Sequence, residues 1–141
     1  MVRQATTKDI RALTSMLKLM TKEIIPEHAS EGLLPYIEVV TSWFEDKKHF
    51  IYIDDKHRGF FLILDDTDIT TPNYHRYIGT KVFIHKEHRK GRLLAQFYKR
   101  LFNDFKDGDI VGLTEIESEH IPVLEKRHKR IANVYLLNKE V

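Results

Sequence analysis

The feature that most constrains this chain is an apolar segment that runs through a short polar turn into a strongly amphipathic helix. Residues from Tyr74 to Ile84 are rich in β-branched and aromatic side chains, which favour a strand. A polar turn with Gly91 follows, and from Lys90 to Phe105 apolar residues recur at steps of three and four. We therefore predict a strand, turn and helix unit within a mixed α+β domain.

The rest of the chain alternates between helical and strand periodicity, with no repeat, low-complexity tract or linker. Further strands are expected at Met1 to Ala5, Phe50 to Ile53, Phe60 to Leu64, Ile110 to Ile116 and Ile131 to Leu137, and further helices at Lys8 to Glu23, Glu31 to Phe44 and His120 to Arg127. Residues Asp54 to Gly59 predict a hairpin turn. All elements belong to a single domain that spans residues 1–141.

Composition supports one globular domain and excludes several kinds of site. Of the 141 residues, 42% are apolar and 31% are charged, which is usual for a folded domain with one core. The absence of cysteine excludes disulfides, thiolate metal sites and a cysteine nucleophile. No apolar run is long enough to cross a bilayer, and the first residues lack the hydrophobic core of a secretory signal. We therefore expect a cytoplasmic protein that does not act in a membrane.

Charge is almost balanced overall but concentrated locally. The 23 basic and 21 acidic residues leave a net charge of +2, which does not indicate a nucleic acid as the partner. Basic side chains gather between Lys81 and Arg100. A nucleic-acid-binding protein that uses this stretch is one hypothesis, which the near-neutral charge and the few aromatic residues among these cations disfavour.

The polar turn has the residues of an anion site. The first backbone N–H groups of a helix have no partner within the helix, and the helix dipole places partial positive charge there. Gly91 allows a ligand to approach closely, and Arg89, Lys90 and Arg92 add full positive charge. The turn therefore predicts a phosphate-binding site, the other interpretation being a solvated basic helix start.

This turn resembles the coenzyme A-binding motif of the GNAT acetyltransferases, written Arg/Gln-x-x-Gly-x-Gly/Ala. Alignment from His88 puts Gly91 on the central glycine, whereas alignment from Arg89 keeps the arginine and puts Arg92 at that position. Residues Arg89 to Arg92 are closer to the Arg-Gly-Gly-Arg version found in some GNAT-like sequences. The turn alone therefore matches the family in part.

Two other segments extend the resemblance over nearly the whole chain. Residues Val2 to Ile10 are similar to the family's first strand and helix start, commonly Ile-Arg-x-Ala-Thr-x-x-Asp-Ile. Residues Pro122 to Arg130, followed by Val134 and Tyr135, resemble its Tyr-Glu-Lys-x-Gly-Phe helix end and final strand. The resemblance implies a central, mostly antiparallel mixed sheet of about six to seven strands, with helices on both faces and splayed strands at the cofactor site.

The resemblance also implies acetyl-CoA as the co-substrate, with no metal. Backbone groups at the end of the strand would bind the pantetheine arm, and the turn would wrap the diphosphate. The implied cofactor-binding residues are Phe83, Ile84, His85, His88, Arg89, Lys90, Gly91, Arg92, Leu93 and Leu94. His85 and His88 have a spacing that would suit a metal, but the chain has no cysteine and no carboxylate pattern nearby to complete a site.

The activity implied is N-acetyl transfer by direct attack of a primary amine on the thioester, with no covalent enzyme intermediate. Candidates for the general base are Glu115, Glu117 and His85, and a water relay is an alternative. The usual acid is a tyrosine, where this chain has Leu124. Tyr135, His120 or Ser118 could replace that degenerate acid position.

These departures leave a second hypothesis open, a catalytically weak GNAT-fold module that binds coenzyme A or a protein partner. The expected partner of an active enzyme is a small-molecule or peptide amine, and a homodimer also stays open. Tyr36, Trp43 and Phe44 either shape the acceptor pocket or belong to the core.

Overall fold

The computed structural model describes residues 1–67 and 73–112 of the chain. Its strands are β1 (Val2–Gln4), β2 (His49–Asp54), β3 (Gly59–Asp65), β4 (Arg76–Ile84) and β5 (Asp109–Gly112), and its α-helices are α1 (Ile10–Ile24), α2 (Leu34–Glu45) and α3 (Leu93–Asp104). Short 3-10 helices are η1 (Thr7–Asp9), η2 (Pro26–His28) and η3 (Lys86–His88). The helix expected at His120 to Arg127 and the strand expected at Ile131 to Leu137 lie outside the described residues.

The described strands form one sheet in the order β1-β2-β3-β4-β5. The three pairs from β1 to β4 are antiparallel, and β4 pairs with β5 in parallel. The predicted mixed, mostly antiparallel sheet is therefore confirmed. Residues 1–67 and 73–112 supply five strands rather than about six to seven, so the higher number stays a prediction.

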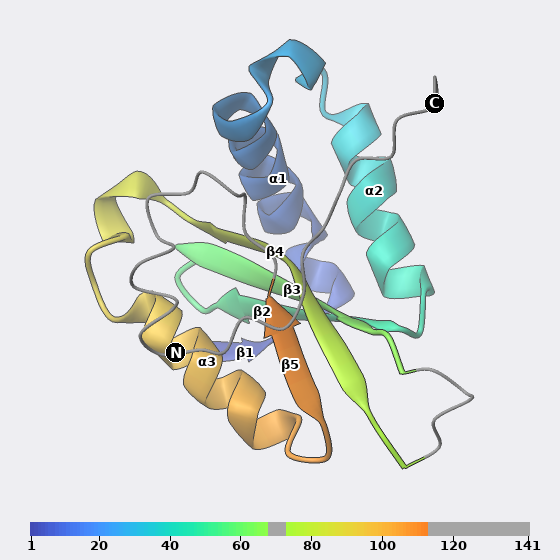
Figure 1. Ribbon diagram of the computed structural model, residues 1–141. Coiled ribbons are helices and arrows are strands. Elements are labelled where there is room, and N and C mark those ends of the chain that lie inside the picture. Colours follow the sequence, from blue (N-terminus) through green and yellow to red (C-terminus); the bar gives the residue numbers. More distant parts are fainter. Residues whose placement is uncertain (68–72, 113–141) are drawn as a thin grey trace, which may run out of the picture.

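Helices cover both faces of the sheet, as predicted (Figure 1). Side chains of α1 and α2 pack on one face, and those of α3 pack on the other. The strands serve both layers because successive residues point to opposite faces: Phe60 and Leu62 belong to the first cluster, Phe61 and Ile63 to the second. β3 therefore lies at the centre of the molecule, buried from both sides.

The helix bounds differ from the predicted ones mainly at the N-terminal ends. α2 begins at Leu34 rather than Glu31, with Pro35 in its first turn as predicted. α3 begins at Leu93 rather than Lys90, because the residues around Gly91 form an open turn instead of helix. None of the helices within the described ranges is both long and apolar enough to cross a membrane.

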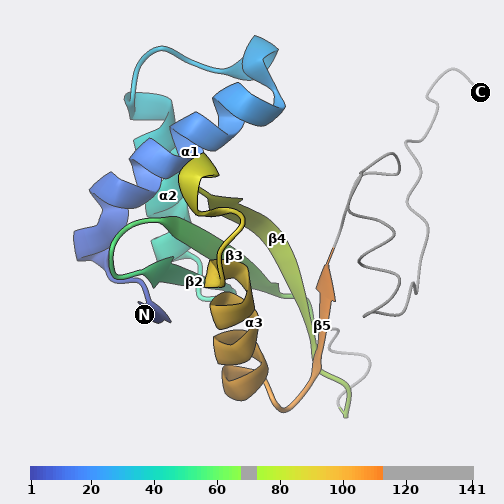
Figure 2. The same cartoon turned by 90° about the vertical axis from the view of Figure 1, so that its left-hand side faces the viewer.

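A bulge in β4 separates two halves of this strand. Leu62 pairs with Lys81 but Ile63 pairs with Gly79, so β4 has one extra residue, Thr80, at this point. The parallel pairing of β4 with β5 extends as far as Gly79 and Gly112, directly before the bulge. Figure 2 shows β4 leaving the direction of β5 toward its C-terminal end. The described strands thus begin to diverge on the side where the resemblance implies a cofactor.

Candidate functional site

The turn from His85 to Arg92 connects β4 to α3. It is called here the phosphate turn, because the sequence predicts a phosphate site at this position. Its first residue is fixed to the neighbouring hairpin, since the His85 N–H donates to the Arg58 carbonyl at 2.9 Å. The turn then closes on itself, because the His88 N–H donates to the His85 carbonyl at 2.9 Å and the Gly91 N–H to the His88 carbonyl at 3.3 Å. The sheet therefore determines where α3 begins.

A row of backbone N–H groups at this point is unpaired. The first N–H of α3 with an acceptor belongs to Gln96, which donates to the Arg92 carbonyl at 3.0 Å. Within the described part of the chain, no hydrogen-bond acceptor is found for the N–H groups of Lys90, Arg92, Leu93, Leu94 and Ala95. Such groups at a helix start favour an anion, both as donors and through the helix dipole.

Gly91 leaves these N–H groups open. It lies outside the helix, its φ is not positive, and a Cβ built on it would be 3.5 Å from the His88 carbonyl oxygen, an ordinary contact. The fold itself would therefore accept a side chain here. A glycine that the backbone does not require fits a position that a ligand must approach closely.

A depression of about 150 Å³ lies against the phosphate turn. It is lined by Arg58, Glu87, His88, Gly91, Arg92, Leu93 and Gln96. The Arg58 guanidinium is paired with Asp54 at 2.6 and 3.0 Å, so Arg92 and Glu87 balance each other in the lining. The preference for an anion therefore comes from the unpaired N–H groups rather than from an excess of side-chain charge. The volume is too small for all of coenzyme A, and suits a phosphate-sized group.

Arg89 does not face this depression in the way the motif suggested. Its Nη1 and Nη2 donate to the two carboxylate oxygens of Glu23 in α1, at 2.7 and 2.6 Å, and its Nε donates to the Ile84 carbonyl at 2.7 Å. The hydrogen bonds from Arg89 hold the pKa of the Glu23 carboxyl below its usual value. Lys86, Lys90 and Arg92 have no ion-pair partner among the described residues.

The remaining predicted cofactor residues divide into backbone and surface groups. Phe83, Ile84 and Leu93 are buried in the two core clusters, so only their backbone groups can reach a ligand. Leu94 is exposed on the outside of α3. The described residues offer no partner strand to β4 beyond Gly79 on its β5 side, which leaves backbone groups there for the predicted pantetheine contact.

His85 is the one predicted catalytic residue whose position is described. It is half-buried directly after β4, with its ring 5.2 Å from that of Phe83 in an edge-on arrangement. The other candidates, Glu115, Glu117 and Tyr135, lie outside the described residues, as do Leu124, His120 and Ser118. The identities of base and acid therefore stay predictions.

The aromatic residues of α2 belong mainly to the core. Tyr36 and Trp43 are buried in the cluster between α2 and the sheet, and the Tyr36 hydroxyl accepts a hydrogen bond from the Ser30 N–H at 2.7 Å. Phe44 is half-buried against the same cluster. The core interpretation is the one that the structure supports for Tyr36 and Trp43.

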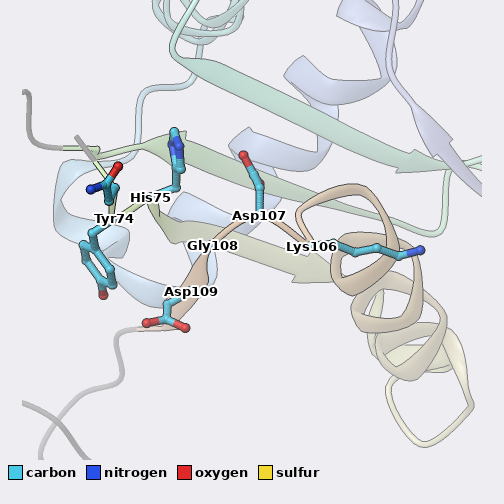
Figure 3. Close-up of a pocket in the computed structure, with 7 residues that line it drawn as sticks. Tyr74, His75, Lys106, Asp107, Gly108 and Asp109 are labelled. Carbon is cyan, nitrogen blue, oxygen red and sulfur yellow. The ribbon is translucent and has the colours of Figure 1, made fainter. Parts of the chain in front are cut away.

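A second, larger hollow of about 280 Å³ lies at the opposite end of β4. Its side chains point in different directions around the ends of β4 and β5 rather than toward a common point (Figure 3). Tyr77, close by in β4, donates its hydroxyl to the Asp107 carboxylate at 3.1 Å; burial and this carboxylate raise the pKa of Tyr77 to about 12. The Asp107 carboxylate therefore has a structural partner in β4. The side chains that line this hollow do not converge as catalytic groups would.

Two residues at the site could not be found from the sequence. Arg58 belongs to the hairpin between β2 and β3, and Glu23 is 66 residues from Arg89. Neither belongs to a motif, and only the packing of the hairpin and α1 beside the turn brings them there. No cluster of histidine and carboxylate residues that could hold a metal occurs in residues 1–67 and 73–112.

No protein-family model and no curated protein matches the sequence. Solved structures do match. A possible acetyltransferase from Clostridium difficile 630 is 17% identical, with a TM-score of 0.76 over 98% of this chain and 96% of that one. AAC(6')-Iy in complex with a bisubstrate analogue, CoA-S-monomethyl-acetylneamine, is 13% identical, with a TM-score of 0.73 over 99% and 97% of the two chains.

A predicted acetyltransferase from Clostridium acetobutylicum, solved with acetyl-CoA, is 17% identical and has a TM-score of 0.69 over 98% of this chain and 95% of that one. At these identities the likeness concerns the backbone and covers nearly the full length of both partners. It agrees with the mixed sheet and the helices on both faces. The chain has the fold of the GNAT acetyltransferases, as a divergent example of it.

Proposed function

We propose that this protein is an acetyl-CoA-dependent N-acetyltransferase that acts on a primary amine of a small molecule or peptide. The observation that carries the proposal is the row of unpaired N–H groups at Lys90 and from Arg92 to Ala95, at the point where β4 leads into α3. A diphosphate offers several oxygen acceptors to such a row. Two similar structures are complexes with acetyl-CoA or a CoA analogue, which supports the same ligand class here.

In the proposed complex, different described residues bind different parts of acetyl-CoA. The N–H groups after Gly91 bind the diphosphate, and the exposed cations Lys90 and Arg92 add charge-assisted contacts. The half of β4 beyond Thr80 offers backbone groups to the pantetheine arm. This places the thioester beside the diverging strands, where an amine can be held close to the carbonyl carbon.

The reaction proposed needs a base and an acid but no covalent enzyme intermediate. The amine nitrogen forms a bond to the acetyl carbon as the carbon–sulfur bond breaks, the amine loses a proton, and the departing thiolate gains one. His85, Glu115 or Glu117, or a water relay, takes the amine proton. Tyr135, His120 or Ser118 replaces the tyrosine usual in the family as the acid.

Calorimetric titration with acetyl-CoA tests the binding half of the proposal. We expect micromolar binding by the natural protein and at least about a tenfold loss in Gly91→Glu, because a carboxylate would face the diphosphate. Gly32→Glu is the matched control, since Gly32 also has free space around it but is remote in sequence from the turn. No binding by the natural protein, or equal binding by both variants, would contradict the assignment.

A thiol-release assay over a panel of primary amines tests the catalytic half. Coenzyme A release that depends on both acetyl-CoA and one class of amine identifies an enzyme. The second candidate, a module that binds coenzyme A or a protein partner without efficient catalysis, is favoured by Leu124 at the position of the family's tyrosine. Tight acetyl-CoA binding without amine-dependent thiol release would select that candidate.

A further inference from the structure

A two-point ion pair joins the phosphate turn to the C-terminal end of α1. Both terminal nitrogens of Arg89 donate to Glu23, at 2.7 and 2.6 Å. The guanidinium carbon of Arg89 lies 5.7 Å from the centre of the Phe83 ring, which packs against one side of it. Together with the bond from Nε to the Ile84 carbonyl, each guanidinium nitrogen has a partner within the protein.

Through these contacts Arg89 connects three elements, α1, β4 and the phosphate turn. Glu23 belongs to α1 and Ile84 ends β4, while Arg89 itself lies in the middle of the turn. The second half of the turn needs such support because its backbone bonds are long. The His88 N–H bond is 2.9 Å, but the Arg89 nitrogen is 3.4 Å from the Lys86 carbonyl oxygen, and the Gly91 nitrogen is 3.3 Å from the His88 carbonyl oxygen. The orientation of the turn therefore depends on the side chain of Arg89 as much as on the backbone.

We propose that Glu23 is a positioning residue for the bound diphosphate: it holds Arg89 in place, so that the turn presents its unpaired N–H groups in one orientation. The inference rests on the proposed function of the turn. It assigns the direct contacts to the backbone and to Lys90 and Arg92, and it gives Arg89 the task of holding the turn. The helix α1 is then linked to the proposed cofactor site by one ion pair.

The opposite relation between Glu23 and Arg89 makes a different prediction. If Arg89 were a phosphate ligand, Glu23 would compete with the phosphate for it, and loss of the carboxylate would strengthen binding. If Glu23 positions the turn, the same loss weakens binding. The sign of a single change in affinity therefore separates the two roles.

The experiment is a calorimetric titration of the full chain with acetyl-CoA, for the natural protein and for Glu23→Gln. We expect about three- to tenfold weaker binding in Glu23→Gln, a modest loss because the ion pair is exposed to solvent. Glu27→Gln is the control, because it removes one negative charge four residues further along, where Glu27 is exposed and outside the ion pair. This control should bind acetyl-CoA as the natural protein does, or slightly more tightly.

A double-mutant cycle distinguishes positioning from a general loss of stability. Because Glu23 acts through Arg89, Glu23→Gln should have no further effect on acetyl-CoA affinity in an Arg89→Gln background. Equal or tighter binding by Glu23→Gln, or independent effects in the cycle, would overturn the inference and leave the proposed function intact. Absence of acetyl-CoA binding by the natural protein would instead remove the proposed function itself, and the inference with it.

Discussion

Two turns lie side by side at the same end of the sheet, and they differ in whether their polar groups are paired by hydrogen bonds. In the hairpin from Asp54 to Gly59, the carboxylate of Asp54 is fully buried and accepts bonds from the Lys56 and Arg58 N–H groups. It also receives the Arg58 guanidinium at 2.6 and 3.0 Å. In the phosphate turn and the first turn of α3, five N–H groups have no acceptor in the described part of the chain.

The difference separates a turn that supports the fold from one that can bind a ligand. Buried polar groups in proteins are nearly always paired, so the hairpin has the pattern expected of a structural turn. The phosphate turn leaves its donors without an acceptor in the described residues, so water can satisfy them and an anion can replace that water. The hairpin from Asp54 to Gly59, whose polar groups are paired, is called here the closed turn, and the phosphate turn is called the open turn. The His85 N–H donates to the Arg58 carbonyl, so the closed turn supports the open turn.

The largest effect is expected in the closed turn. Asp54→Ala should lower the free energy of unfolding by about 2–4 kcal/mol, because it leaves Arg58 and two N–H groups of the hairpin without their acceptor. Urea unfolding followed by circular dichroism measures this loss. The neighbouring Asp55 is the control, because its side chain is exposed and pairs with Arg3 alone among the described residues: Asp55→Ala should cost less than about 1 kcal/mol. Equal losses in both variants would contradict the distinction.

Acid should lower the free energy of unfolding by protonating Asp9, which lies beside the closed turn. Asp9 is buried, bonded twice to Arg3 at 2.8 Å, and lies 3.8 Å from the His57 ring of the hairpin. The hydrogen bonds from Arg3 lower the pKa of Asp9 from 3.8 to about 2. Because the folded-state pKa is the lower one, the carboxylate stabilises the fold above pH 4 and this contribution is lost as the pH falls toward 2.

Comparison of the natural protein with Asp9→Asn isolates that contribution. The free energy of unfolding should be about 1–2 kcal/mol higher for the natural protein near neutral pH, and the gap should close in acid. Urea titrations at about pH 6 and about pH 2.5 provide the two measurements. A gap that persists unchanged at the lower pH would show that ionisation of Asp9 is not its source.

Substitutions in the open turn should change the affinity for acetyl-CoA rather than the free energy of unfolding. Replacing Lys90 and Arg92 together by alanine should weaken acetyl-CoA binding by about tenfold, equivalent to about 1.4 kcal/mol, because two exposed charge-assisted contacts are lost. The free energy of unfolding should stay within about 0.5 kcal/mol, since neither side chain has an ion-pair partner in the described residues. Added salt should reduce the difference in affinity between the natural protein and the variant.

A matched double variant, Lys8→Ala with Lys47→Ala, changes the net charge equally at two exposed positions that are remote in sequence from the turn. It should bind acetyl-CoA as the natural protein does. If it loses as much affinity as the turn variant, the effect reflects overall charge, and the local contacts assigned to Lys90 and Arg92 are wrong.

Much of this architecture could be predicted from periodicity. The hairpin from Asp54 to Gly59, the long strand that ends at Ile84 and the amphipathic stripe of α3 all follow from local patterns that the fold preserves. The start of α3 was predicted too early because Lys90 is compatible with helix. Gly91 and the closure onto the His88 carbonyl keep the residues before Leu93 out of it.

The partners of the site could not be predicted in the same way. Arg89 matches the motif as a phosphate ligand, yet its guanidinium pairs with Glu23, 66 residues away. Arg58 reaches the depression only because the hairpin packs beside β4. Such contacts depend on tertiary packing, for which a single sequence carries no periodic signal.

The smallest effect is expected from Gly91→Ala. A Cβ at this position meets nothing nearer than the His88 carbonyl oxygen at 3.5 Å, so the free energy of unfolding should change by no more than about 0.5 kcal/mol. Under the proposed function the same methyl group would stand in the path of the diphosphate toward the N–H groups, so acetyl-CoA affinity should fall by roughly two- to fivefold. Urea unfolding and calorimetric titration on one preparation measure both quantities.

Gly59 in the closed turn provides the opposite case. A Cβ there would be 2.5 Å from the Phe83 carbonyl oxygen, so Gly59→Ala must shift the backbone between β3 and β4 and should cost more than about 1 kcal/mol of stability. One glycine is then required by the fold and the other by the ligand. A loss of stability in Gly91→Ala as large as in Gly59→Ala would mean that both glycines serve the backbone, and the absence of a side chain at Gly91 would no longer indicate a bound phosphate.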